Sequence, residues 1–202
     1  MKHKSVIIIG IIIGVFLVAK KSLANQENKE LFEKIFENTF NFETSNGKRD
    51  EQYEHGTLIS KYGIQQDTYN DYSKHNKTQW RGISKIDFAE AKKIYHWIFY
   101  DRRKVYLLPA FIQGIVFDYV FWLPKYAIED LQKIVGAKID GGIGKETTDK
   151  TVEYLNRVDV NTFIEKYNAM RWKRMQSRDN FEENKDGWRN RLKKLEQLYR
   201  KE

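Results

Sequence analysis

The chain has 202 residues, of which 41% are hydrophobic and 14% aromatic, and this suits one compact unit with a sizeable core. It contains no cysteine, which excludes disulfides, thiol nucleophiles and cysteine metal sites. The formal net charge is +8, but the excess of Lys and Arg lies in the first 21 residues and in residues 171–202. Because these basic residues are not interleaved with aromatic ones along one face, no nucleic acid is expected as a partner.

The first 24 residues predict a secretion signal or a membrane anchor. Residues 5–19 carry no charge and lie between Lys4 and Lys20. A full membrane span takes about 20 residues, so this run is short for a span but suits a signal-peptide core. Ser22-Leu23-Ala24 has small residues at the spacing that a signal peptidase prefers. The segment is therefore a cleaved signal peptide, a retained N-terminal hydrophobic helix acting as a signal anchor, or a signal-arrest-release segment.

Each alternative places the rest of the chain outside the cytoplasm, since cytoplasmic loops tend to keep the positive charge. We expect a protein that is anchored in the inner membrane and faces the periplasm, or one exported to the periplasm or cell wall.

The next segment predicts a helix that ends near a carboxylate. Its apolar residues recur on one helix face, and Glu43 follows seven residues after Phe36 on that face. Apolar surroundings disfavour the charged form of an acid and raise its pKa, as a general acid requires near neutral pH. The structural alternative is a glutamate that extends into solvent from the last helical turn.

The remaining pattern predicts mainly helices. A short hairpin is expected between Gln52 and Ile64, and a Ser84/Asp87 capping box opens a helix that continues to about Ile98. Residues 107–123 are nearly continuously apolar and predict a central buried helix, with a second membrane span as the weaker alternative. Four more helices follow, over residues 126–135, 145–157 and 161–175, the last of these capped by Asp159, and over an amphipathic C-terminal segment around Trp188.

The order of several segments resembles glycoside hydrolase family 108, a family of lysozyme-like N-acetylmuramidases. Residues 32–36, Glu43 and residues 61–72 resemble its catalytic half, and residues 91–101 and 116–118 resemble the segments that follow. Residues 140–147 and 187–191 resemble the peptidoglycan-binding portion that completes such proteins. The chain departs from the family in having Thr44-Ser45 where two glycines usually follow the acid, a single glycine at Gly56, and Trp122 in place of an asparagine.

The resemblance implies a mainly α, lysozyme-like α+β fold with a small β element near the catalytic cleft. It implies a catalytic domain over residues 25–105 and a helical peptidoglycan-binding-like domain over residues 106–202, packed together behind the leader at residues 1–24. The implied activity is cleavage of the bond between N-acetylmuramic acid and N-acetylglucosamine in peptidoglycan. The expected protein is a monomer that contacts the membrane through its N-terminal segment, with a holin or a secretion apparatus as partner in lysis or wall remodelling.

Glycoside hydrolysis needs an acid and usually a second polar group, and this defines the predicted site residues. Glu43 is the predicted general acid. Glu54 is the predicted second carboxylate, and Asp50 and Glu51 are the alternatives for this second role. Thr57 and Ser60 are predicted to hold the water. Carboxyl groups about 6.5 to 9.5 Å apart would indicate inversion, and about 5 Å retention.

Tyr62, Tyr100 and Asp118 are predicted substrate contacts, although Tyr62 could instead support the turn at Gly63 and Asp118 could pair with an arginine. The four histidines lack metal-ligand spacing, so no metal or other cofactor is expected. The alternative function is a catalytically weakened peptidoglycan-binding protein or membrane-anchored scaffold, suggested by the missing glycines around Glu43 and by Trp122 at the altered asparagine position.

Overall fold

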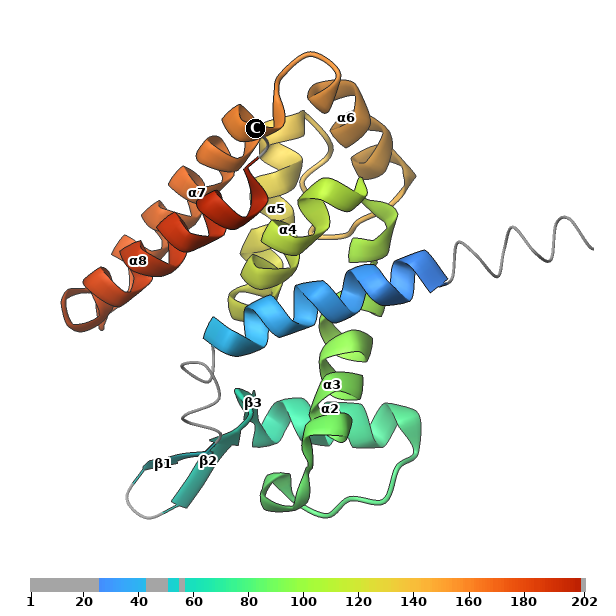
Figure 1. Cartoon of the computed structure of the whole chain (residues 1–202), viewed down its shortest axis with the longest axis vertical. Coiled ribbons are helices and arrows are strands. Elements are labelled where there is room, and N and C mark those ends of the chain that lie inside the picture. Colours follow the sequence, from blue (N-terminus) through green and yellow to red (C-terminus); the bar gives the residue numbers. More distant parts are fainter. Residues whose placement is uncertain (1–25, 43–50, 55–56, 201–202) are drawn as a thin grey trace, which may run out of the picture. The chain divides into compact units, whose positions relative to one another are not determined.

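The structure is a computed structural model that describes residues 26–42, 51–54 and 57–200 (Figure 1). The predicted leader, Glu43 and Asp50 lie outside these ranges. The chain divides into two compact units, Met1–Lys34 and Ile35–Glu202. In the first unit residues 26–34 are helical, and the side chain of Gln26 donates a 3.0 Å hydrogen bond to Glu30 one turn later. The second unit begins with helical residues 35–42 and holds the remaining elements.

A three-stranded antiparallel sheet follows, in the order β1-β2-β3, and it confirms the predicted hairpin. Its strands are β1 (Glu51–Glu54), β2 (Thr57–Lys61) and β3 (Ile64–Gln65). Gln52 pairs with Ser60 but Tyr53 pairs with Leu58, so Ile59 is the extra residue of a β-bulge. The turn between β2 and β3 consists of Tyr62 and Gly63, both at positive φ (52° and 73°). Two-residue hairpin loops favour this backbone conformation because it matches the twist of the strands.

The helices α2 (Gln66–Asn76) and α3 (Phe88–Tyr95) come next, joined through a short turn η1 (Ile83–Lys85). The predicted capping box is only partly correct. The cap of α3 is Asp87, whose carboxylate accepts a 2.8 Å hydrogen bond from the Glu90 backbone N–H, and Ser84 lies earlier, within η1. After Tyr95 the helix widens into a π-helical turn η2 (His96–Asp101) and a short turn η3 (Val105–Leu107).

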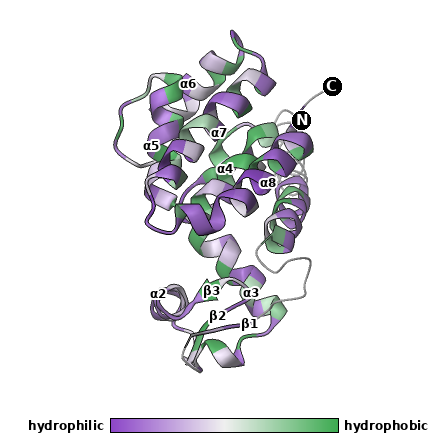
Figure 2. Cartoon of the chain, turned by 90° about the vertical axis from the view of Figure 1, so that its left-hand side faces the viewer, coloured by the Kyte–Doolittle hydropathy of each residue, from purple (hydrophilic) through white to green (hydrophobic). Residues whose placement is uncertain are grey.

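Helix α4 (Ala110–Trp122) is the central helix of the second unit and confirms the predicted buried helix. Pro109 caps its start, so the helix begins three residues later than the apolar run does. Residues 112–120 are all buried, and the helix contacts α5, α7 and α8 (Figure 2). Within the described ranges, no helix combines the length and hydrophobicity that crossing a bilayer requires, so a membrane span at residues 107–123 is not supported.

Four helices complete the chain and agree with the predicted order. They are α5 (Pro124–Val135), α6 (Lys145–Leu155), α7 (Val160–Gln176) and α8 (Phe181–Tyr199). Asp159 caps α7 as predicted, accepting from the backbone N–H groups of Asn161 and Thr162 at 2.9 and 3.0 Å. Helices α7 and α8 lie side by side (Figure 1), and α8 buries Trp188, Leu192 and Leu195 against Met175 of α7. The predicted amphipathic helix is thereby confirmed.

The Asp140-Gly141-Gly142 loop is held by one buried side chain, Gln132 of α5. The amide nitrogen of Gln132 lies 2.7 Å from Asp140 Oδ1 and 2.9 Å from the Gly142 carbonyl. Its amide oxygen accepts from the backbone N–H groups of Asp140 and Gly141 at 3.1 and 3.0 Å. These contacts pair three backbone groups of the loop and satisfy the amide of Gln132, which is fully buried and would be costly to leave unpaired. The motif therefore stabilises the connection between α5 and α6.

The C-terminal end of α8 packs directly on α4 at Gly114. A Cβ atom built on Gly114 would collide with the ring of Tyr199, so the absence of a side chain is what lets this ring approach. Burial raises the pKa of the Tyr199 phenol to about 12, and its hydroxyl accepts a hydrogen bond from Asn38 at 3.4 Å. Gly187, in the middle of α8, has open space around it instead.

We expect Gly114→Ala to lower the free energy of unfolding by about 1 to 3 kcal/mol, because the added methyl group forces Tyr199 out of its place. The matched control is Gly187→Ala, which should raise the free energy of unfolding by about 0.5 to 1 kcal/mol through helix propensity alone. Urea unfolding followed by circular dichroism measures both. Equal effects of the two substitutions would contradict the close packing at Gly114.

Candidate active site

A groove of about 560 Å³ lies within the second unit, between the sheet and the helices. On the side of the sheet it is lined by four uncharged polar residues and a glycine: Gln52 of β1, Ser60 of β2, Gly63, Gln65 of β3 and Thr68 of α2. Ser60 is only 4% exposed and donates a 3.0 Å hydrogen bond to Gln52. This pair bridges the two strands beside the β-bulge, and the structure places the predicted site residue Ser60 in the groove wall.

Aromatic and polar residues of the helical part form the other lining of the groove. Phe99, Phe121, Trp122 and Pro124 come from η2, α4 and the start of α5, and Arg178, Asn180, Asn184 and Trp188 come from the α7–α8 corner. The rings of Trp122 and Trp188 meet edge to face with centroids 5.5 Å apart. The groove therefore combines aromatic faces with amide and hydroxyl groups, the composition typical of sites that bind polar ligands with apolar faces.

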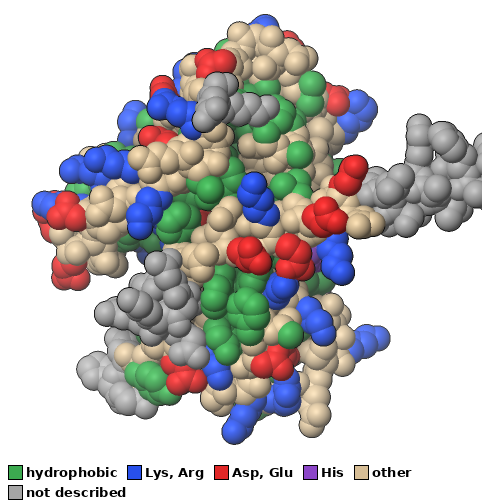
Figure 3. All heavy atoms as spheres, viewed as in Figure 1, with side chains coloured by type: hydrophobic (Ala, Val, Ile, Leu, Met, Phe, Trp, Pro, Cys, Tyr) green, Lys and Arg blue, Asp and Glu red, His purple; other side chains and the backbone are tan. Residues whose placement is uncertain are grey.

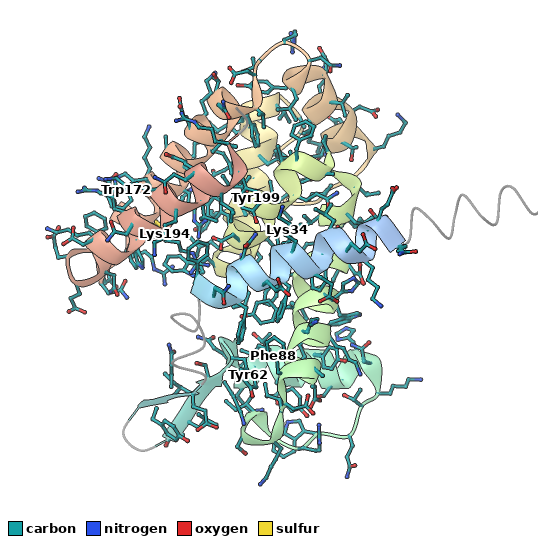
Figure 4. The ribbon with its side chains drawn as sticks, in the orientation of Figure 1. Lys34, Tyr62, Phe88, Trp172, Lys194 and Tyr199 are labelled. Carbon is teal, nitrogen blue, oxygen red and sulfur yellow. The ribbon has the colours of Figure 1, made fainter. Side chains whose placement is uncertain are left out.

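Tyr62 lies beside the groove, next to its lining residue Gly63. Its ring packs against Phe40 and Phe88 with centroids 6.0 and 6.1 Å away, and Lys61 Nζ lies 5.6 Å from the ring centroid. Figure 4 labels Tyr62 and Phe88 where Figure 3 shows hydrophobic side chains gathered at the surface, and Phe88 is 42% exposed. The Tyr62 carbonyl accepts a 2.9 Å hydrogen bond from Tyr95. These contacts favour the alternative that Tyr62 supports the turn.

The remaining residues of the predicted site are only partly described. Glu43 lies outside the described ranges, and Glu54 is described by its backbone alone, paired with Thr57 at the tip of the hairpin. Thr57 is exposed and is not among the residues that line the groove. Glu51 lies 3.3 Å from Lys61 and accepts a 2.7 Å hydrogen bond from Tyr53, and these two contacts lower the pKa of its carboxyl group. Glu51 is thus engaged in the hairpin.

Tyr100 does not line the groove, which corrects one predicted substrate contact. Its side chain is 2% exposed, and its hydroxyl donates a 2.5 Å hydrogen bond to Gln113 of α4. Gln113 in turn donates to the Leu108 carbonyl at 2.7 Å. Burial raises the pKa of the Tyr100 phenol to about 12, so the group stays protonated and acts as a core hydrogen-bond donor.

Asp118 is also buried, and the alternative that it pairs with arginine is the one the structure supports. Its side chain is inaccessible to a sugar: Oδ1 accepts from Arg171 at 2.7 Å, and Oδ2 accepts from Arg191 at 2.6 Å. Thr39, in the last turn of the described helix 35–42, lies 3.5 Å from Oδ2. Burial by itself would raise the pKa of Asp118, but Arg191 and Arg171 outweigh it and hold the pKa below its ordinary value.

The arginines of this network connect the core to the groove, a link that the sequence pattern did not reveal. The guanidinium of Arg191 lies 5.2 Å from the ring of Phe42 and 5.2 Å from the ring of Trp122. Arg171 lies 5.5 Å from the same Trp122 ring. Asp118 therefore positions, through its arginines, one wall of the groove and the last described residue before Glu43. The only sequence signal was an acid inside an apolar helix, which requires buried cations as partners.

Residues 36–122 match the sequence model of the family Glycosyl hydrolase 108. This match covers 87 of the 202 residues; it confirms the predicted resemblance over that segment and supports a glycoside hydrolase. The fold, mainly helical with a small antiparallel sheet, agrees with the predicted lysozyme-like class.

The chain is also similar to a solved structure described as that of Brucella abortus SagA. The TM-score is 0.68 at 19% sequence identity, and the alignment covers 85% of this chain and 94% of that chain. No curated protein matches the sequence. At this identity the likeness to SagA shows the fold, while the family match carries the enzyme class. Within the part of the chain that the structure describes, no group of acidic or histidine side chains is arranged to hold a metal ion.

We expect Asp118→Asn to lower the free energy of unfolding by about 3 to 5 kcal/mol, because it leaves two buried guanidinium groups without their counter-charge. The matched control is Asp149→Asn on the surface of α6, where the carboxylate pairs with Lys145 in solvent. This control should lower the free energy of unfolding by less than about 0.5 kcal/mol. Chemical unfolding at pH 7 measures both, and comparable losses would contradict the buried ion-pair network.

The same pair of proteins should also differ in their response to acid. A carboxylate with a lowered folded-state pKa contributes stability that is fully present above its ordinary pKa and is lost as the pH falls through the folded-state pKa. The stability difference between wild type and Asp118→Asn should therefore shrink below pH 3.8, the ordinary value for this group. A difference that stays constant down to the acid transition would contradict a charged Asp118 in the folded protein.

Proposed function

We propose that this protein is a peptidoglycan hydrolase, an N-acetylmuramidase that cleaves the glycosidic bond between N-acetylmuramic acid and N-acetylglucosamine. The observation that carries the proposal is the groove of about 560 Å³, much of whose lining lies within the segment that matches the glycosyl hydrolase family. Amides and hydroxyls suit sugar hydroxyls and acetamido groups, and the tryptophan faces suit the apolar side of a sugar ring.

Glu43 is the proposed general acid. It directly follows Phe42, whose ring lies against Arg191 and packs on the cluster that includes Trp122 and Trp188. Both tryptophans line the groove. The proposed acid thus directly follows a residue that packs on the same cluster as these groove-lining tryptophans. Apolar surroundings would keep it protonated near neutral pH.

The full chain should release reducing ends from purified sacculi, and Glu43→Gln should lower that rate by about two orders of magnitude or more, the scale of general acid catalysis. Glu37→Gln is the matched control, because Glu37 is exposed on the described helix six residues earlier in the sequence and undergoes the same chemical change. It should retain the wild-type rate. If both variants cleave like wild type, Glu43 is not the acid.

Glu54 is the proposed second carboxylate, two positions along β1 from the groove residue Gln52. Its neighbour Glu51 is the weaker choice, because its carboxylate already contacts Lys61 and Tyr53. Ser60, which lines the groove, and Thr57 at the hairpin tip are the proposed hydroxyls that orient water.

We expect Glu54→Gln to lower the cleavage rate by about two orders of magnitude, the scale expected when a catalytic base or nucleophile is lost, while Glu51→Gln lowers it by less than about threefold, as for an exposed ion pair. Reducing-end release from sacculi measures the rates, and proton NMR of the first-formed anomer separates inversion from retention. The opposite ranking of the two variants would assign the role to Glu51.

We further propose that residues 1–24 export the protein or anchor it in the inner membrane, so that the groove meets peptidoglycan in the periplasm. Lysis with a holin and wall opening for a secretion apparatus are both compatible with this activity. The second candidate function is a weakened enzyme that mainly binds peptidoglycan. Besides the missing glycines around Glu43, it is favoured by the bulky Trp122 in the groove wall, at a position where the family usually has asparagine.

A further inference from the structure

We infer that the corner between α7 and α8 completes the glycan groove, and that Arg178 binds a carboxylate on the substituent of the sugar chain. The inference rests on the proposed function and extends it to the recognition of the substrate. Arg178, Asn180 and Asn184 line the groove from this corner, yet they lie far beyond residues 36–122, which match the family. The groove is therefore built in part by residues to which the family match assigns nothing.

Arg178 lies in the turn between α7 and α8. Several nearby arginines have acidic partners: Arg174 pairs with Asp130, Arg191 with Asp118 and Arg200 with Glu165. Arg189 instead lies over the ring of Trp172, with its guanidinium 5.2 Å from the ring centroid. The guanidinium of Arg178 makes no hydrogen bond or ion pair with any other residue that the structure describes. Its backbone is nevertheless fixed, because its N–H donates to the Met175 carbonyl at 3.1 Å and its carbonyl accepts from Phe181 at 3.0 Å.

The charge of the groove points to the kind of group that Arg178 binds. Of the described residues that line the groove, Arg178 is the single cation, and none of them is acidic. The other polar lining groups are amides and hydroxyls such as Gln65, Asn180 and Thr68, which suit neutral sugar groups. A planar guanidinium fits a carboxylate with two parallel hydrogen bonds. A cation that faces no acid in this wall is therefore available for an anionic group of the ligand.

The glycan itself supplies the reason for a separate anion site. Its hydroxyl and acetamido groups are neutral, so a carboxylate can come only from the substituent on muramic acid, as the lactyl group or the peptide attached to it. In intact peptidoglycan the lactyl group is in amide linkage, which leaves the peptide carboxylates as the free anions. Arg178 would then favour strands that carry such acids over neutral amino-sugar polymers.

The test compares the full chain with Arg178→Gln on intact sacculi and on sacculi whose carboxylates have been converted to methylamides. On intact sacculi Arg178→Gln should raise KM by about three- to tenfold with kcat unchanged, the range for a charge contact at a groove rim. On methylamidated sacculi the two proteins should have the same KM, and on intact sacculi their difference should shrink at high salt. Arg178→Lys should retain part of the wild-type affinity, because it keeps the charge.

Lys173→Gln is the matched control, since it removes one positive charge from the exposed surface of α7 outside the groove lining. It should leave KM unchanged on both substrates. Equal defects of Arg178→Gln on intact and methylamidated sacculi, or no defect on either, would overturn the inference. Strands stripped of peptide by an amidase carry a free lactyl carboxylate: a defect that persists on them assigns the contact to the lactyl position, and one that disappears assigns it to the peptide, and both results support a carboxylate contact.

The same proteins are also co-sedimented with intact and methylamidated sacculi, so that the contact is measured even if no bond is cut. Binding by wild type without any cleavage would contradict the proposed function while leaving the carboxylate contact open to measurement. Equal binding of Arg178→Gln and Lys173→Gln to intact sacculi would contradict the contact itself.

Discussion

The structure depends on one buried carboxylate, Asp118, shared between two arginines from different helices. Arg171 of α7 and Arg191 of α8 both reach it, at 2.7 and 2.6 Å, and Thr39 approaches it from the first helix. Buried charges are tolerated only when they are paired and hydrogen-bonded, so these elements must assemble together. Because both arginines also lie on the ring of Trp122, the constraint that orders the core also fixes a wall of the groove.

Most of the helical architecture could be predicted from the sequence, because apolar periodicity, prolines and capping residues act locally. Asp159 caps α7 through its side chain, and Pro124 occupies the first turn of α5, as their chemistry favours. The start of α3 was less predictable, because Ser84 and Asp87 are both competent caps. The choice of Asp87 depends on the η1 turn that positions Ser84 upstream. Nothing local signals that α3 passes into a π-helical turn at His96.

The site was less predictable because its residues converge only in the folded chain. Ser60 is predicted as a hydroxyl in the segment between Glu43 and Tyr62 that could hold water, and its side chain lies in the groove lining. The sequence allows either a substrate contact or an arginine partner for Asp118, and it does not decide between them because Arg171 and Arg191 are 53 and 73 residues away. Arg178 and Trp188 line the same groove from the far end of the sequence, and no motif connects them with Gln52.

The location of the two arginines restricts which segments of this protein can be exchanged with those of another protein. The segment that matches the family ends at Trp122. It therefore contains Asp118 but neither of the arginines, Arg171 and Arg191, that pair with it. If that segment alone were transferred into another protein, Asp118 would be a buried carboxylate without its arginine partners. The groove would also lose the lining residues that come from the corner between α7 and α8. Recombination, in the laboratory or in evolution, has to exchange the chain from the first helix through α8 as one block.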